Sequence, residues 1–184
     1  VLLVGGSLGA RTLNESVMAN LELIRKSDAQ VVWQTGSFYY QEMLERLGDN
    51  CPKNLQAMEF VSRMDLAYAV ADVVVSRAGA GTISELCLLG KPSVLVPSPN
   101  VAEDHQTKNA MALVENQAAL LIKDADSKEQ LWPETFKLLN DKMKLNSLAE
   151  NIKKLAKPNA AKEIVDVIMG VLKSPLPVPP KGES

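Results

Sequence analysis

Short apolar segments alternate with helix-forming segments along most of the chain, and this alternation restricts the folds that it can adopt. Hydrophobic periodicity predicts strands at residues 1–4, 30–34, 56–60, 72–75, 93–96 and 118–122. It predicts helices at residues 11–25, 38–47, 64–70, 82–89, 104–115 and, with breaks near Asn140 and Pro158, 127–172. Such alternation is typical of a parallel sheet covered by helices on both faces. We therefore predict an α/β fold, a Rossmann-like doubly wound parallel sheet of about six strands.

The composition is that of a globular domain. Of the 184 residues, 46% are hydrophobic, which suffices for one sizeable core or at most two small ones. A formal net charge of −2 gives no electrostatic reason to expect a nucleic-acid partner. Cys51 and Cys87 lack metal-ligand or redox spacing and suit a reducing compartment. No apolar run approaches the roughly 20 residues that span a bilayer.

The two ends of the chain differ from its middle. The first residues already follow a buried-strand pattern, so we interpret Val1 as a cut end of a longer protein. Residues 174–184 hold four of the ten prolines and little core material. We predict one domain over residues 1–173, followed by a disordered tail or a tag remnant over 174–184.

The first glycine-rich loop, Gly5–Arg11, follows the first predicted strand and leads into a helix. Glycines here let the backbone approach a ligand, and the helix N-terminus attracts an anion. The dinucleotide fingerprint G-x-G-x-x-G would require a glycine where Ser7 stands, and an acid at the end of the second strand. That strand ends in Gln34, so NAD is disfavoured. A tight turn without a ligand remains an alternative.

The second such loop is Ser76–Glu85, where another predicted strand leads through glycines into a helix. It forms a second candidate anion site in the same sheet. The Glu85 carboxylate could accept hydrogen bonds from two adjacent hydroxyls, such as a ribose diol. The simpler explanation is that Glu85 is an acid in the first helical turn, where the helix dipole favours it.

The third polar segment, Pro97–Ala110, carries the single histidine, His105, into a predicted helix. Its polar groups could bind sugar hydroxyls. The alternative is a helix capped by Asp104 or Asn100, with His105 merely exposed.

Together, the three segments resemble the C-terminal domain of the MurG family of transferases. The matching stretches are VLLVGGSLGAR, MEFVSRMDLAYAVADVVVSRAGAGTISEL and KPSVLVPSPNVAEDHQTKNA, and with the intervening helices they cover nearly all of residues 1–172. The combination is more specific than any one motif. Related two-domain transferases, such as galactolipid synthases, share the SRAGAGT-type helix start but match the other segments less well.

The resemblance implies one half of a GT-B glycosyltransferase, with a site for UDP-N-acetylglucosamine. It places Gly6, Ser7 and Gly9 beside the diphosphate, Phe60 and Val61 around the uracil, and Glu85 on the ribose hydroxyls, with the Val61 backbone reading the base edge. The remaining substrate contacts that it implies are Arg77, the helix start Gly79, Ala80, Gly81 and Thr82 at the phosphates, and His105, Gln106 and Asn109 at the sugar. Glutamine also occurs in the family at the position of His105.

The implied reaction is transfer of N-acetylglucosamine, with inversion, to lipid-linked N-acetylmuramyl-pentapeptide in peptidoglycan synthesis. Two helix N-termini would stabilise the departing diphosphate without a metal or other cofactor. The general base, the acceptor site and the membrane-docking surface would belong to an N-terminal domain that this sequence lacks. We therefore expect a soluble fragment, inactive alone, of a protein peripheral to the cytoplasmic side of the bacterial cell membrane.

Three other functions stay open at this point. The domain could bind the donor of another UDP-sugar GT-B transferase, such as a glycolipid synthase. It could belong to a dinucleotide-dependent oxidoreductase, although the missing acid after the second strand argues against this. It could also be a non-catalytic protein-interaction module, which would show no preference for uridine nucleotides.

Overall fold

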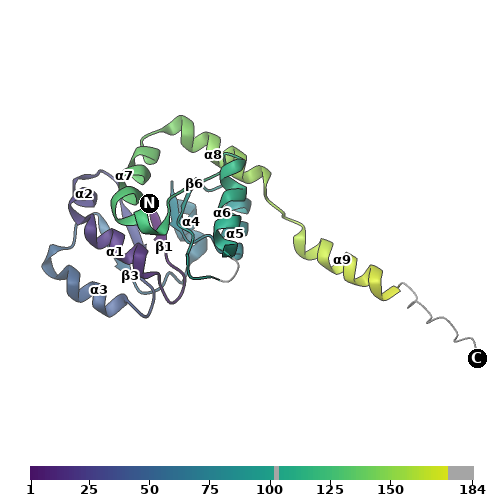
Figure 1. Cartoon of the computed structure of the whole chain (residues 1–184), viewed down its shortest axis with the longest axis horizontal. Helices are drawn as coiled ribbons and strands as arrows, with labels where there is room; N and C mark the ends of the chain where they lie inside the picture. Colours follow the sequence, from purple (N-terminus) through teal and green to yellow (C-terminus); the bar gives the residue numbers. More distant parts are fainter. Residues whose placement is uncertain (102–103, 174–184) are drawn as a thin grey trace, which may run out of the picture.

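Six short parallel strands form a single sheet in the computed structural model, which describes residues 1–101 and 104–173 (Figure 1). The strand order is β3-β2-β1-β4-β5-β6. The strands are β1 (Leu2–Val4), β2 (Val31–Gln34), β3 (Leu55–Met58), β4 (Val74–Ser76), β5 (Ser93–Leu95) and β6 (Leu120–Leu121). The predicted α/β fold with six parallel strands is confirmed.

The centre of the sheet contains its switch point. β1 pairs with β2 on one side, Leu3 opposite Trp33, and with β4 on the other, Leu3 opposite Val75. The chain builds outward from β1 to β3 and then crosses back to β4. In open α/β sheets, the crevice at such a reversal, beyond the carboxyl ends of the strands, is where ligands bind.

Helices connect the strands and cover both faces of the sheet (Figure 1). The α-helices are α1 (Arg11–Ala19), α2 (Leu21–Lys26), α3 (Tyr40–Leu47), α4 (Met64–Val70), α5 (Ala80–Leu89), α6 (His105–Glu115), α7 (Ser127–Leu139), α8 (Lys142–Lys154) and α9 (Ala160–Lys173). The described residues also include the 3₁₀ turns η1 (Gly48–Asn50) and η3 (Asp124–Asp126).

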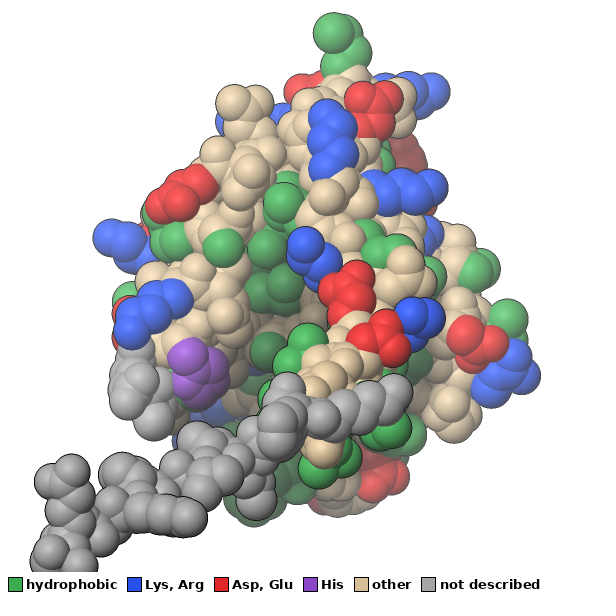
Figure 2. Space-filling model, turned by 90° about the vertical axis from the view of Figure 1, so that its right-hand side faces the viewer, with side chains coloured by type: hydrophobic (Ala, Val, Ile, Leu, Met, Phe, Trp, Pro, Cys, Tyr) green, Lys and Arg blue, Asp and Glu red, His purple; other side chains and the backbone are tan. Residues whose placement is uncertain are grey.

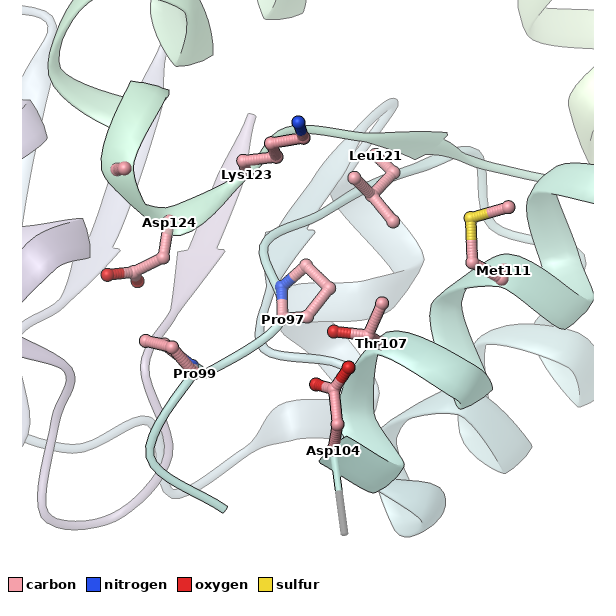
Figure 3. A pocket seen from close by; sticks show the side chains of 9 residues that line it. Pro97, Pro99, Asp104, Thr107, Met111, Leu121, Lys123 and Asp124 are labelled. Carbon is pink, nitrogen blue, oxygen red and sulfur yellow. The ribbon is translucent and has the colours of Figure 1, made fainter. Parts of the chain in front are cut away.

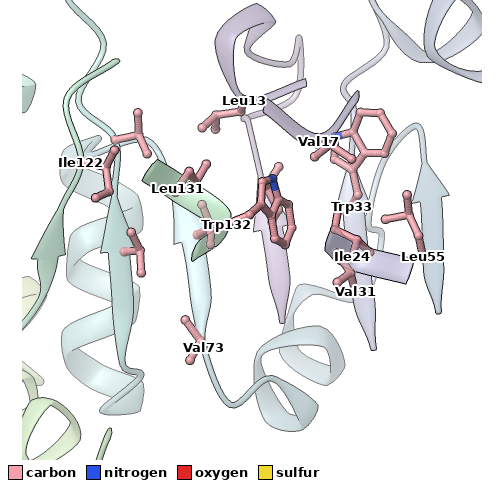
Figure 4. Packing of buried hydrophobic residues seen from close by; sticks show 14 of the residues in the cluster. Leu13, Val17, Ile24, Val31, Trp33, Leu55, Val73, Ile122, Leu131 and Trp132 are labelled. Atoms are coloured by element: carbon pink, nitrogen blue, oxygen red, sulfur yellow. The ribbon is translucent and has the colours of Figure 1, made fainter. Parts of the chain in front are cut away.

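Alternating strand residues divide the core into two layers. Leu3 belongs to the layer under α1, α2, α3 and α7, whereas Leu2 and Val4 belong to the layer under α4, α5 and α6. Figure 4 shows the first layer, in which Trp33 of β2 and Trp132 of α7 lie among aliphatic side chains. Both tryptophans are fully buried, and the same layer includes Val75 of β4 and Val94 of β5, so it extends across the sheet.

The expected helix 11–25 is interrupted at Asn20. The Asn20 side-chain amide donates to Ser16 O at 2.8 Å and to Lys128 O at 2.7 Å. The chain therefore continues as two helices, α1 and α2, rather than one. Asparagine is prone to such backbone bonds, which compete with helix continuation.

Two element boundaries near the expected site also differ from the prediction. β3 ends at Met58, so Phe60 follows the strand instead of belonging to it. α5 begins at Ala80 rather than at residue 82, which places Glu85 in the second turn. The first turn of α5 holds no acid, so the explanation of Glu85 as a first-turn acid is wrong.

The C-terminal part of the described chain projects from the body. The breaks predicted near Asn140 and Pro158 are confirmed by the ends of α7 and α8 and the start of α9. α9 points away from the sheet, and its residues 161–172 are exposed (Figure 1). The predicted tail, 174–184, lies outside the described residues, and the domain boundary at 173 stays a prediction. Within residues 1–101 and 104–173, no helix has the length and apolar character needed to cross a membrane.

Candidate functional site

A pocket of about 390 Å³ lies at the switch point of the sheet. Seven of the fourteen predicted site residues line it, namely Gly6, Phe60, Arg77, Gly79, Thr82, Glu85 and Gln106. They come from the segments that follow β1, β3, β4 and β5, which the parallel sheet brings to one edge. The other lining residues are Val4, Gly5, Gln34, Met64 and Tyr68. The fold thus gathers residues that are up to 100 positions apart in sequence into one hollow.

The glycines of the loop after β1 have two different roles. Gly6 adopts a φ of +86°, and a Cβ there would meet nothing within 4 Å, so its backbone faces open space at the pocket. Gly9 also has a positive φ, but a Cβ there would lie 2.0 Å from Thr35 O. Gly9 is therefore required for close packing against the loop after β2, which supports the turn explanation for this residue.

The N-terminus of α5 opens into the same pocket. Gly79 is its N-cap residue, and the first intrahelical bond runs from Ile83 N–H to Gly79 O at 3.0 Å. The preceding N–H groups have no acceptor inside the helix. A Cβ at Gly79 or Gly81 would meet nothing within 4 Å, so a ligand can approach this backbone closely. The arrangement suits an anion, because the partial positive charge of the helix end points at it.

Glu85 is held by a neighbouring helix. Its Oε2 accepts a hydrogen bond of 3.0 Å from the hydroxyl of Tyr68, on α4. Burial of the phenol, followed by its bond to Glu85, raises the pKa of Tyr68 above its ordinary value, so the hydroxyl remains a donor at neutral pH. A carboxylate has about four acceptor positions, and the phenol uses one of them. Glu85 can therefore still accept hydroxyl donors from a ligand.

The loop after β3 forms the wall opposite α5. Phe60 is 56% exposed and lines the pocket, whereas Val61 is buried. The backbone N–H of Val61 donates to Gln34 Oε1 at 3.2 Å, and the Gln34 amide donates to Gly6 O at 2.9 Å. One buried side chain thus joins the two loops. The Val61 N–H is already bonded, so the expected reading of a base edge by this backbone stays a prediction.

The Arg77 side chain makes its contacts with other residues of the protein. Its guanidinium forms an ion pair with Asp124 of η3 and donates to Val96 O at 3.1 Å and Pro97 O at 3.3 Å. Asp124 also accepts from the Thr12 hydroxyl at 2.9 Å. Arg77 therefore links the ends of β4 and β5 to α1 and η3. Its predicted role as a substrate contact stays a prediction.

The residues expected at the sugar lie around the start of α6. Gln106 lines the pocket and accepts a 2.9 Å bond from Ser98 N–H. Asn109 donates to Ala78 O at 3.1 Å and so ties α6 to the loop before α5. His105 is exposed, and Figure 2 shows the single histidine, in purple, at the surface. Asp104 occupies the N-cap position of α6 with a φ of +52°, but its side chain makes no capping bond.

The remaining predicted residues surround the pocket without lining it. Ser7 is exposed, and its carbonyl accepts from Ser37 N–H at 3.1 Å. Ala80 and Gly81 are exposed in the first turn of α5, next to Gly79 and Thr82, which do line the pocket. Gly9 differs from these residues, because it is covered by the loop after β2.

A second hollow, of about 630 Å³, lies beside the ends of β5 and β6. Figure 3 shows Pro97 between Thr107 of α6 and Asp124 of η3 at its wall. The hollow is larger, but none of the fourteen predicted residues lines it. The ion pair of Arg77 with Asp124 separates the two hollows, because Arg77 lines the first and Asp124 the second. The convergent backbone donors and Glu85 favour the smaller one as the functional site.

Five lining residues of the pocket are not among the predicted site residues: Val4, Gly5, Gln34, Met64 and Tyr68. Met64 and Tyr68 are four positions apart on α4, a spacing that places them on one helix face. In the sequence, Gln34 is notable only as the end of the second strand, where a dinucleotide-binding site would have an acidic residue. Gln34 is the last residue of β2, and its side-chain amide bonds to the loop at Gly6 and to the loop at Val61. Among residues 1–101 and 104–173, no group of three or more His, Cys, Asp or Glu side chains could hold a metal ion.

Comparisons with known proteins support the fold and its family. A family model described as the glycosyltransferase family 28 C-terminal domain matches residues 1–164. A UDP-N-acetylglucosamine--N-acetylmuramyl-(pentapeptide) pyrophosphoryl-undecaprenol N-acetylglucosamine transferase from Parabacteroides distasonis is 51% identical over 172 residues, or 94% of this chain and 47% of the relative. The transferase of the same name from Bacteroides fragilis is 52% identical over 164 residues, or 88% of this chain and 43% of the relative.

A solved structure gives the same result. The crystal structure of Acinetobacter baumannii MurG superposes with a TM-score of 0.79 at 32% identity, over 92% of this chain and 49% of that one. The chain thus spans about half the length of the relatives that it matches. The likeness confirms the expected architecture, a Rossmann-like half of a GT-B fold.

Proposed function

Because this chain belongs to the glycosyltransferase family 28 C-terminal domain family, we propose that it is the donor-binding half of a hexosyltransferase that uses UDP-N-acetylglucosamine. The observation that carries the proposal is the pocket at the switch point. It combines the open backbone of Gly6 and Gly79, the carboxylate of Glu85 and the exposed ring of Phe60. These are the groups that a diphosphate, a ribose diol and a flat base require.

Each part of the pocket matches one part of the donor. The N-terminus of α5 and the loop at Gly6 take the diphosphate, since both offer backbone free of neighbouring atoms. Glu85 takes the ribose hydroxyls, and Phe60 packs on the uracil. Gln106, with His105 and Asn109 beside it, faces the sugar from the start of α6.

The proposed chemistry is an inverting transfer. The acceptor hydroxyl attacks the anomeric carbon from the face opposite UDP, the bond from that carbon to the diphosphate oxygen breaks, and a base removes the hydroxyl proton. Negative charge grows on the departing diphosphate in the transition state. Backbone donors already oriented at α5 stabilise this charge without reorganisation and without a metal or other cofactor.

The acceptor, the general base and the membrane contact are assigned to the half of the protein that this chain does not include. Its relatives are named for transfer to N-acetylmuramyl-(pentapeptide) pyrophosphoryl-undecaprenol. We propose that acceptor for the whole protein, which would act in peptidoglycan synthesis, peripheral to the cytoplasmic side of the membrane. On the face in Figure 2, acidic and basic side chains are interspersed, in keeping with the absence of a nucleic-acid partner from the proposal.

Isothermal titration of the chain with UDP, UDP-N-acetylglucosamine, UDP-glucose and ADP tests the proposal. UDP should bind more tightly than ADP, because the wall at Phe60 and Val61 is matched to uracil. UDP-N-acetylglucosamine should bind at least as tightly as UDP-glucose. Equal affinities for UDP and ADP would contradict base recognition, and tight NADH binding would favour a dinucleotide-dependent enzyme.

A further inference from the structure

Tyr68 joins the candidate ribose site to the hydrophobic core. Its side chain, on α4, is only 4% exposed and packs in the core layer that includes Leu2, Val74 and Leu86. A ring held among strand and helix residues has little freedom to move. The position of its hydroxyl is therefore set by the core, although Tyr68 also lines the pocket.

Glu85 has the opposite character. It is an exposed residue with several rotatable bonds, so its carboxylate would sample many positions if nothing restrained it. Within the described part of the chain, the Tyr68 hydroxyl donates a hydrogen bond of 3.0 Å to Glu85 Oε2 and so restrains this carboxylate. The two residues are 17 positions apart, on helices that pack on the same face of the sheet.

The chemistry of this bond suits positioning rather than catalysis. A phenol whose pKa is raised by burial stays protonated over the neutral range, so its hydroxyl remains available to donate to the carboxylate. Hydrogen bonds to an ionised acceptor are stronger and better oriented than neutral ones. The carboxylate retains acceptor positions on both oxygens for further donors.

We propose that Tyr68 is a positioning residue that orients the Glu85 carboxylate toward the ribose hydroxyls of the bound nucleotide. This inference rests on the proposed function, since it requires that Glu85 receive a ribose diol. By restricting Glu85 before the ligand arrives, Tyr68 lowers the conformational entropy lost on binding. The contribution of Tyr68 to the affinity should therefore depend on Glu85 and on the ribose hydroxyls, and on no other part of the ligand.

The test measures binding of UDP and of 2′,3′-dideoxy-UDP to the wild-type chain and to Tyr68→Phe. The variant keeps the ring and loses only the hydroxyl, so the core remains filled. UDP binding should weaken roughly 3- to 10-fold, the effect of one hydrogen bond. Binding of 2′,3′-dideoxy-UDP should be the same for both proteins. In a Glu85→Ala background, Tyr68→Phe should cause no further loss for either ligand.

Tyr40→Phe is the matched control, because Tyr40 lies on α3 and does not line the pocket. It should leave both affinities unchanged. Equal weakening of UDP and dideoxy-UDP in Tyr68→Phe would mean that the hydroxyl only shapes the pocket, and would overturn the inference. An effect that persists with Glu85→Ala would mean direct ligand contact, and would also overturn it. If wild type binds UDP and Tyr68→Phe binds it equally well, the inference alone fails; if wild type does not bind UDP, the proposed function fails as well.

Discussion

Glu85 is the residue at which the structure separates two explanations that the sequence left open. As a first-turn acid it would serve the helix dipole, but α5 begins at Ala80 and places it one turn further on. In the second turn the dipole effect is weak, because it falls off within the first turn. The bond from Tyr68 and the place of Glu85 in the pocket favour a ligand-binding role instead.

Glu85→Gln tests that role. The substitution keeps the shape and the helical propensity of the side chain but removes its charge-assisted hydrogen bonds to hydroxyls. We expect UDP binding to weaken by about 1.5–3 kcal/mol, with the free energy of unfolding nearly unchanged. Titration calorimetry and urea denaturation measure the two quantities separately. Unchanged UDP affinity would remove Glu85 from the site and weaken the assignment of its neighbours.

At the scale of elements, the site depends on how the loops after β1 and β2 pack together. Gly9 and Gly36 both have positive φ and touch one another, and a Cβ on either would overlap backbone atoms at 2.0 Å. Gln34 adds a second connection, from the loop at Gly6 to the loop at Val61. These contacts hold the Gly6 side of the pocket against the loop that carries Phe60 and Val61.

A pair of glycine substitutions distinguishes packing from ligand approach. Gly9→Ala should lower the free energy of unfolding by more than about 2 kcal/mol, because it adds overlap with Thr35 to backbone strain. Gly6→Ala has open space around it and should cost only about 1–2 kcal/mol through its positive φ. Urea denaturation gives both values.

In the same pair, UDP affinity should respond in the opposite order. Gly6→Ala puts a methyl group at the pocket and should weaken UDP binding more than folded Gly9→Ala does, because Gly9 packs on Thr35 and does not line the pocket. Equal stability losses would show that the loops do not pack as described.

At the scale of the whole molecule, the chain is a folded unit that we propose to hold one half of a site. Two core layers pack on its sheet, and the chain spans only about half of each relative. A transferase must hold donor and acceptor together, because proximity and orientation supply much of its rate. A chain that bound only the donor would not bring the two substrates together.

We expect transfer from UDP-N-acetylglucosamine to a lipid-linked N-acetylmuramyl-pentapeptide to be undetectable with this chain alone. Radiolabelled donor and extraction of the lipid product measure the transfer. UDP binding by the same preparation is the control, since it shows that the protein is folded. Turnover at the rate of a two-domain transferase would contradict the assignment of the base and acceptor site to the other half.

The sequence alone determined the class of the fold and the positions of the glycine-rich loops that follow its strands. Strands such as Leu2–Val4 and helices such as Met64–Val70 follow from hydrophobic periodicity, which is a local property. The glycine loops at Gly6 and Gly79 are local as well, because positive φ and exposed helix ends depend on the residues that form them.

The tertiary structure decided which of those residues come into contact and which of them line the pocket. Gly6 and Gly9 look alike in sequence, yet one faces open space and the other packs on Thr35, because only the neighbouring loop distinguishes them. Tyr68 belongs to the pocket because α4 and α5 cover the same face of the sheet, a contact between segments that no local pattern encodes. Local preferences fix the elements, while side-chain partners across the sheet depend on packing of the whole chain.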